Sequence, residues 1–125
     1  MSALGRDDAR AERRRRYRLG HVAEWIAAAY LACRGYRILA RRYNTPSGEI
    51  DLIVVRRRRL AFIEVKQRRD DALAESAITP RQRQRIHRAA EIWVGRHPHY
   101  AAHERSFDVV FIRPGRWPRH IEGGL

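Results

Sequence analysis

Three charged residues stand in two short apolar runs, where charge is unusual. Asp51 lies inside the first run, residues 50–54. Glu64 and Lys66 belong to the second, which begins at Phe62. A carboxylate in such surroundings normally needs a partner, because an unpaired buried charge is costly. Carboxylates are ligands of Mg²⁺ and Mn²⁺, and a neighbouring ammonium can orient a water molecule. The residue types therefore predict a metal-dependent hydrolytic centre made by Asp51, Glu64 and Lys66.

The two runs, residues 49–55 and 60–66, are short and rich in β-branched side chains, which favours strands. The four arginines at 56–59 divide them, and a four-residue loop there would make an antiparallel hairpin. In that register Asp51 lies opposite Glu64, with Cβ atoms roughly 5 Å apart. Facing like charges destabilise a sheet and should raise the pKa of one carboxyl group unless a cation compensates them. The hairpin therefore predicts a divalent-cation site.

Lys66 is the only lysine among the 27 basic residues of the chain. It follows Glu64 by two positions, so both side chains should lie on one face of a strand. Arginine is always protonated, whereas the pKa of a lysine shifts readily near other charges. A role in holding a nucleophilic water molecule would explain this single exception. Chance placement of the one lysine is the alternative.

The charge of the chain indicates its partner. A formal net charge of +13 in 125 residues should attract nucleic acid. DNA is the expected partner, with RNA left open, and a general preference for arginine is the plainer explanation of the charge. No membrane partner is expected, because no apolar run is long enough to span a bilayer. The residues expected to bind the nucleic acid are Arg56, Arg57, Arg58, Arg59, Arg81, Gln82, Arg83 and Arg85.

The pattern along the chain predicts an α/β fold with an αβββαβ core, in which helices flank a mixed central sheet. Residues 1–18 are expected to form a flexible basic arm, and residues 19–125 a single domain. One cysteine and no secretory signal point to the cytoplasm, with nucleoid association at most. In chain order the expected elements are a helix over 19–34, strands over 36–43, 49–55 and 60–66, a helix over 80–96, a strand over 107–112, and an edge strand or tail over 117–121.

The sequence GEIDLI at 48–53, followed by FIEVK at 62–66, resembles the D…ExK core of the PD-(D/E)xK nucleases. From about residue 19 to 121 the chain resembles the YraN-like family of small bacterial proteins, uncharacterised protein family 0102. Gly20, Glu24, Gly35-Tyr36 and FDVV at 107–110 carry that resemblance further. It implies a restriction-endonuclease-like fold similar to Holliday-junction resolvases, with metal at Asp51 and Glu64. It also implies branched or junction DNA as a substrate class, and a homodimer.

The resemblance draws attention to two more residues. In resolvase-like members a glutamate of the first helix joins the metal site, which here would be Glu24; an exposed helix glutamate is the alternative. Many relatives carry a lysine at the start of the second helix, where this chain has Gln82. Either Arg81 or Arg83 supplies the missing charge, or Gln82 forms hydrogen bonds in the site as it stands.

Two functions fit these residues. The first is a Mg²⁺- or Mn²⁺-dependent endonuclease that hydrolyses DNA phosphodiester bonds. The second is a non-catalytic nucleic-acid-binding module of the same fold, whose binding would be salt-sensitive and independent of metal. The intact D…ExK set favours the enzyme, because a pure binding protein would gain from neutral side chains at Asp51 and Glu64.

Overall fold

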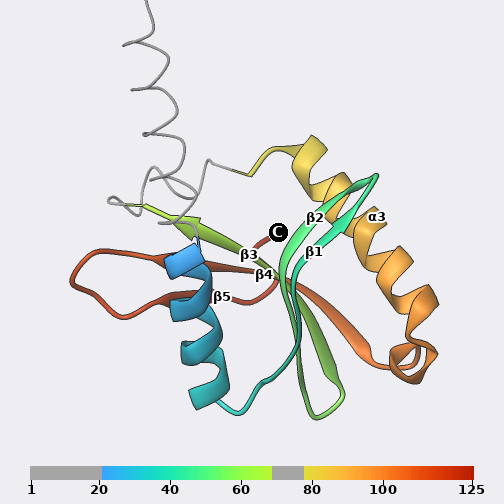
Figure 1. Cartoon of the computed structure of the whole chain (residues 1–125), viewed down its shortest axis with the longest axis horizontal. Coiled ribbons are helices and arrows are strands. Elements are labelled where there is room, and N and C mark those ends of the chain that lie inside the picture. Colours follow the sequence, from blue (N-terminus) through green and yellow to red (C-terminus); the bar gives the residue numbers. More distant parts are fainter. Residues whose placement is uncertain (1–20, 69–77) are drawn as a thin grey trace, which may run out of the picture.

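The computed structural model describes residues 21–68 and 78–125, and the predicted arm over 1–18 lies outside them. A five-stranded sheet in the order β1-β2-β3-β4-β5 lies between two helices (Figure 1). This confirms the α/β class with a central sheet flanked by helices. The elements are a helix over 21–33, β1 (Arg37–Thr45), β2 (Gly48–Arg56), β3 (Arg59–Gln67), α3 (Pro80–Arg96), the short 3₁₀ helix η1 (Pro98–Tyr100), β4 (Glu104–Ile112) and β5 (Arg119–Ile121).

The sheet is mixed. Strands β1, β2 and β3 pair in antiparallel fashion, whereas β3 and β4 are parallel. Parallel neighbours need a long crossover, and α3 supplies it between β3 and β4. The short strand β5 pairs antiparallel with β4 at the edge of the sheet. The predicted element order is thus confirmed, and residues 119–121 form the edge strand rather than a tail.

The sheet is buried on both faces because side chains alternate along each strand. On one face Leu31 of the helix over 21–33 packs with Leu52 and Ile63. On the other face Trp93 of α3 packs with Phe62, the two rings meeting edge to face. The helices therefore cover opposite faces, as Figure 1 shows, and strands β2 and β3 form the centre of both cores.

The hairpin has the predicted register but a shorter turn. Val55 pairs with Leu60, and pairing continues regularly to Leu52 and Ile63. The expected four-residue loop is wrong, because Arg56 and Arg59 pair within the strands and only residues 57–58 make the turn. Regular pairing stops one position before Asp51 and Glu64, so these two residues lie where the strands begin to separate.

Strand β1 departs from the simple alternation expected over residues 36–43. Its register shifts between Ile38 and Ala40, and Arg42 has a φ of 53°. A positive φ is uncommon for a residue other than glycine. The irregularity turns the side chain of Arg42 toward the helix over 21–33, where it contacts Glu24.

No helix in the described part of the chain is both long enough and apolar enough to cross a membrane.

Candidate active site

The side chain of Asp51 forms a hydrogen bond to β3 just beyond the last backbone pair of the β2–β3 ladder. Its Oδ2 accepts a hydrogen bond of 2.8 Å from the backbone N–H of Val65. The carboxylate therefore replaces a backbone carbonyl as the partner of β3. This bond fixes Asp51 against the strand that carries Glu64 and Lys66, so the local fold positions all three predicted residues together.

Glu64 and Lys66 form an ion pair on one face of β3. The Nζ of Lys66 lies 3.1 Å from the Oε1 of Glu64, and both side chains are largely buried. The residues between and before them, Val65 and Ile63, pack in the core under the helix over 21–33. Glu64 and Lys66 consequently lie on the α3 side of the sheet, which confirms the shared face predicted from their spacing.

Crowded negative charge perturbs Asp51. The pKa of Asp51 is raised to about 8, mainly by burial and next by the charge of Glu64. Glu24 and Glu49 act in the same direction, while the hydrogen bond from Val65 opposes them. The expectation that crowding raises the pKa of one carboxyl group is thus confirmed for Asp51. Near neutral pH this group holds a proton unless a cation replaces it.

Glu24 is a buried acid, with 4% of its surface exposed. Its Oε2 accepts a hydrogen bond of 2.9 Å from the Nε of Arg42, but its Oε1 has no hydrogen-bond partner among residues 21–68 and 78–125. The alternative of an exposed helix glutamate is therefore wrong. The effect of Glu24 on the pKa of Asp51 places its charge close to the candidate site.

A cleft of about 210 Å³ opens between the hairpin and the first turns of α3. It is lined by Gly48, Glu49, Asp51, Glu64, Gln82, Arg85 and Ile86. Strand and helix approach closely at Gly48, where an added Cβ would lie 3.0 Å from the Cβ of Arg85 and 3.2 Å from its carbonyl oxygen. The glycine of the GEID motif thus permits the contact that narrows the cleft.

Gln82 lines this cleft and also caps α3. Its backbone N–H donates to Oγ1 of Thr79, and its side-chain oxygen accepts from the N–H of Thr79 at 3.3 Å. Such a capping box satisfies backbone donors that the first turn of a helix leaves free. Gln82 therefore helps to place the start of α3 beside the carboxylates.

Arginines on α3 line a second cleft of about 450 Å³, which meets the first at Arg85. Arg81, Arg85 and Arg88 are spaced by four and three residues and so share one helix face. Arg83 is exposed but does not line the cleft. Arg88 lies on the same helix face and extends the basic surface that the sequence predicts at Arg81 and Arg85.

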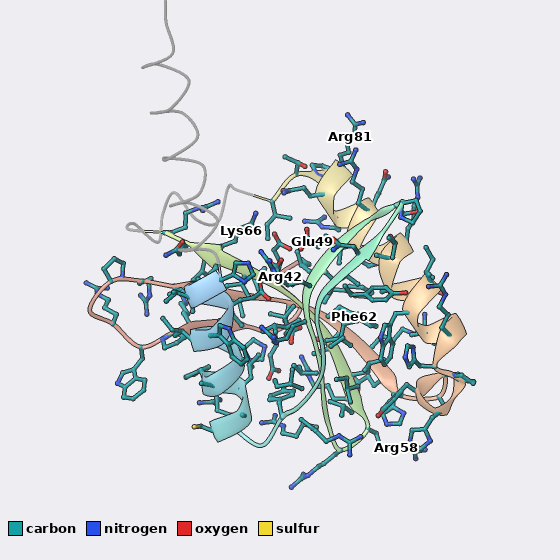
Figure 2. The ribbon with its side chains drawn as sticks, in the orientation of Figure 1. Arg42, Glu49, Arg58, Phe62, Lys66 and Arg81 are labelled. Atoms are coloured by element: carbon teal, nitrogen blue, oxygen red, sulfur yellow. The ribbon has the colours of Figure 1, made fainter. Side chains whose placement is uncertain are left out.

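The arginine turn lies far from the carboxylates. Figure 2 shows Arg58 near the bottom of the molecule, whereas Glu49 and Lys66 lie in its upper half. Two of the four arginines are engaged within the fold: Arg56 donates to the carbonyl of Arg34 at 3.0 Å, and Arg59 donates to Ser106 at 2.6 Å. Arg57 and Arg58 are exposed. The structure therefore brings Arg81 and Arg85 to the site, whereas the arginines at 56–59 lie away from it.

The donor set fits a small divalent cation. In the described part of the chain no three or more His, Cys, Asp or Glu side chains are grouped as a metal cage. Mg²⁺ does not need one, because it commonly takes one or two carboxylates and keeps several waters. Asp51 and Glu64, which both line the cleft, supply that number, whereas Glu24 does not line it.

Comparisons with known proteins place this chain in a defined family. A family model described as "Uncharacterised protein family UPF0102" matches residues 23–112. A UPF0102 protein of Parvibaculum lavamentivorans is 52% identical over 105 residues, which cover 84% of this chain and 79% of the relative. One from Chelativorans sp. is 46% identical over 115 residues, covering 92% and 93%. These matches confirm the resemblance to the YraN-like family, and the family description assigns no activity.

Replacement of Gly48 by Ala should push β2 away from α3. The added methyl group meets backbone atoms of Arg85, so we expect a loss of about 1–3 kcal/mol in the free energy of unfolding, measured by denaturant titration. Gly95→Ala is the matched control, because its Cβ would meet nothing within 4 Å and alanine favours a helix. Equal effects of the two substitutions would contradict the close contact.

Asp51→Asn should stabilise the cation-free protein, and more so as the pH rises. The folded-state pKa of about 8 lies above the ordinary 3.8, so the folded chain binds this proton more tightly than the unfolded chain. The contribution of the Asp51 proton to the free energy of unfolding is fully present below about pH 4 and is lost as the pH rises through 8. In chelator, the melting temperature of the variant should therefore exceed that of the wild type most at pH 8. The expected shift is about 4–8 °C for each kcal/mol gained in the free energy of unfolding.

Asp108→Asn provides the contrast. Hydrogen bonds from His120, Ser106 and the N–H of Gly123 hold the pKa of Asp108 below its usual value, although burial alone would raise it. Its substitution should lower the melting temperature at pH 8. If Asp51→Asn also melted lower than wild type in chelator, Asp51 would be a structural partner of a cationic side chain instead.

Proposed function

We propose that this chain, which belongs to the uncharacterised protein family UPF0102, is a Mg²⁺- or Mn²⁺-dependent endonuclease that hydrolyses DNA phosphodiester bonds. One observation carries the proposal: Asp51 and Glu64 line a single cleft, Lys66 is ion-paired to Glu64, and an arginine-lined cleft adjoins it. Acid groups for a cation, a positioned ammonium and a surface for phosphates are thereby adjacent.

Asp51 and Glu64 are the residues that would hold the cation, and the charge of Glu24 acts on Asp51 although Glu24 does not line the cleft. When bound, a divalent cation would polarise the scissile phosphate and favour ionisation of water. The chain's own contribution begins with Asp51, whose carboxylate is fixed by the Val65 amide and would have to give up its proton where a cation binds. Binding should therefore tighten as the pH rises toward 8.

Lys66 supplies a compact donor next to the carboxylates. Glu64 holds its ammonium at 3.1 Å, so the group is oriented before substrate arrives. It would direct a water molecule toward the phosphate and stabilise the negative charge that develops there. Arg81, Arg85 and Arg88 would bind phosphates flanking the bond that is cut.

A non-catalytic nucleic-acid-binding module is the second candidate. The basic face of α3 would serve either function. Asp51 separates them, because a buried carboxyl group with a raised pKa lowers the stability of a chain that gains nothing from it. A cleavage screen tests the choice, using branched, junction, duplex and single-stranded DNA, with Mg²⁺, Mn²⁺ or chelator. Cleavage that requires the cation and is lost in Asp51→Asn supports the enzyme.

Lys66→Arg should largely abolish cleavage and leave DNA affinity almost unchanged. Charge is conserved, but the planar guanidinium cannot occupy the position of a compact ammonium or shift its pKa. Single-turnover cleavage and equilibrium binding measure the two effects separately. Arg83→Lys is the matched control, since it makes the converse exchange at an exposed position outside the clefts. Wild-type turnover in Lys66→Arg would remove this residue from the mechanism.

Replacement of Arg81 and Arg88 by Ser should weaken duplex binding and flatten its salt dependence. Each lost phosphate contact should reduce the log–log slope by ~0.9. The matched pair is Arg57→Ser with Arg58→Ser, which removes the same charge at the hairpin turn, away from the candidate site. A larger effect of the turn variant would instead assign DNA contact to that turn.

A further inference from the structure

A groove of about 760 Å³ lies outside the proposed centre, where the segment between β4 and β5 approaches the helix over 21–33. Its floor is the end of the parallel β3–β4 pair, where Gln67 pairs with Ile112 and the N–H of Arg68 donates to the Ile112 carbonyl at 3.1 Å. Ile26 of the helix and Trp117 of the segment between β4 and β5 also line the groove. The floor is therefore hydrogen-bonded sheet, which gives the groove a fixed shape.

Trp117 is the most exposed of the large hydrophobic side chains in the described ranges, at 82%. No other ring or guanidinium stacks on its indole in the part of the chain that the structure describes. Its backbone is held, because the Nη2 of Arg113 donates to the Trp117 carbonyl at 3.1 Å. Trp25 differs: the guanidinium of Arg41 lies 3.8 Å from the centre of its ring. Trp117 therefore presents an open aromatic face on an anchored loop.

The described lining of the groove is basic. Arg68, Arg113 and Arg116 line it, and no acidic residue within 21–68 and 78–125 does. A groove that combines arginines with an open aromatic ring fits an unpaired nucleic-acid strand, because bases stack on the ring while the phosphates meet the cations. Bases within a duplex are already stacked on one another and cannot use the ring in this way.

We propose that this groove binds a single-stranded segment of nucleic acid, with a base stacked on Trp117 and phosphates on Arg68 and Arg116. Gln67 directly follows Lys66, so the groove begins within roughly 3.3 Å of strand length from the candidate centre. Because side chains alternate along β3, the groove lies on the opposite face of the sheet from the candidate centre. The nucleic-acid strand would therefore pass around the end of β3 to reach that centre. That the strand continues into the cleavage site rests on the proposed function; binding in the groove does not. The implied substrate carries an unpaired stretch beside the bond that is cut.

A second copy of the chain is a poorer occupant. In a symmetric dimer the same patch meets itself, so the arginines of the two grooves would face one another. Like charges brought together across an interface are unfavourable. Single-stranded nucleic acid instead supplies the opposite charge along the whole groove.

Binding without cleavage tests the proposal. The full chain is titrated in chelator with a fluorescein-labelled dT15 strand and with a 15-base-pair duplex, followed by anisotropy. We expect Trp117→Ala to weaken binding of the strand by roughly tenfold and to leave duplex binding unchanged. Trp117→Phe, which keeps an aromatic face, should restore most of the affinity. Trp25→Ala is the matched control and should alter neither affinity.

Arg116→Ser should lower the log–log salt slope for the strand by ~0.7, as expected for one contact on a single strand. Wild-type strand affinity in Trp117→Ala would overturn the proposal, as would an equal loss for strand and duplex. So would a change from dimer to monomer in sedimentation, which would identify a second copy as the occupant. Circular dichroism and melting confirm that each variant is folded.

The outcomes for the groove and for the proposed nuclease are distinguishable. If no substrate is cut but strand binding depends on Trp117, the nuclease proposal fails and the groove stands. If DNA is cut while Trp117→Ala binds dT15 normally, the groove proposal fails and the nuclease stands.

Discussion

The hydrogen bond from the amide of Val65 to Asp51 joins β2 and β3 at the point where their backbone ladder has ended. It brings a carboxylate into the space where the two strands separate, beside Glu64 and within the influence of Glu24. The surrounding elements offset the resulting repulsion. Arg42 turns toward Glu24 through an irregular β1, Lys66 pairs with Glu64, and α3 covers the hairpin. Asp51 alone has no cationic partner among these contacts, so nothing in them offsets the burial and the neighbouring negative charge that raise its pKa.

Asp108 shows how the same fold treats an acid that serves structure. It is fully buried on β4, yet it accepts hydrogen bonds from His120, Ser106 and the backbone of Gly123. Arg59 adds an ion pair at 3.4 Å. These partners tie the start of β3 to β5 and the end of the chain, and they favour the ionised form. A buried charge with this many partners is stabilising, whereas one that lacks them needs another reason to be present.

Much of the scaffold could be predicted because its signals are local. The hairpin register followed from two apolar runs whose side chains must all face a core, since a shift of one residue would reverse every face. The bounds of α3 followed from Pro80 and the periodic apolar residues Ile86, Ala89 and Trp93. The fourth strand was predicted three residues too short, because residues 104–106 are polar and their pairing with β3 is not visible locally.

What could not be predicted depends on contacts between distant segments. The turn of the hairpin is short because Arg56 reaches Arg34, and Arg59 reaches Ser106. The burial of Glu24 depends on Arg42, whose direction is set by an irregularity in β1 that no local pattern marks. The groove beside Trp117 likewise requires β4, β5 and the first helix to be assembled. Sequence reasoning found the acids, the lysine and the arginines at the start of α3, but not that the two clefts meet at Arg85, which depends on how α3 packs on the hairpin.

The type of basic side chain that pairs with each acid supports a chemical role for Glu64. Among the described ion pairs, the buried acids Glu24 and Asp108 are both paired with arginine, as is the exposed Glu91. Only Glu64 is paired with lysine. An arginine would satisfy a purely structural pair at least as well, because its planar fork suits a carboxylate and is always charged. Lysine adds a small donor that rotates freely and whose charge responds to its neighbours. The chain uses that property only where its carboxylates meet the open cleft.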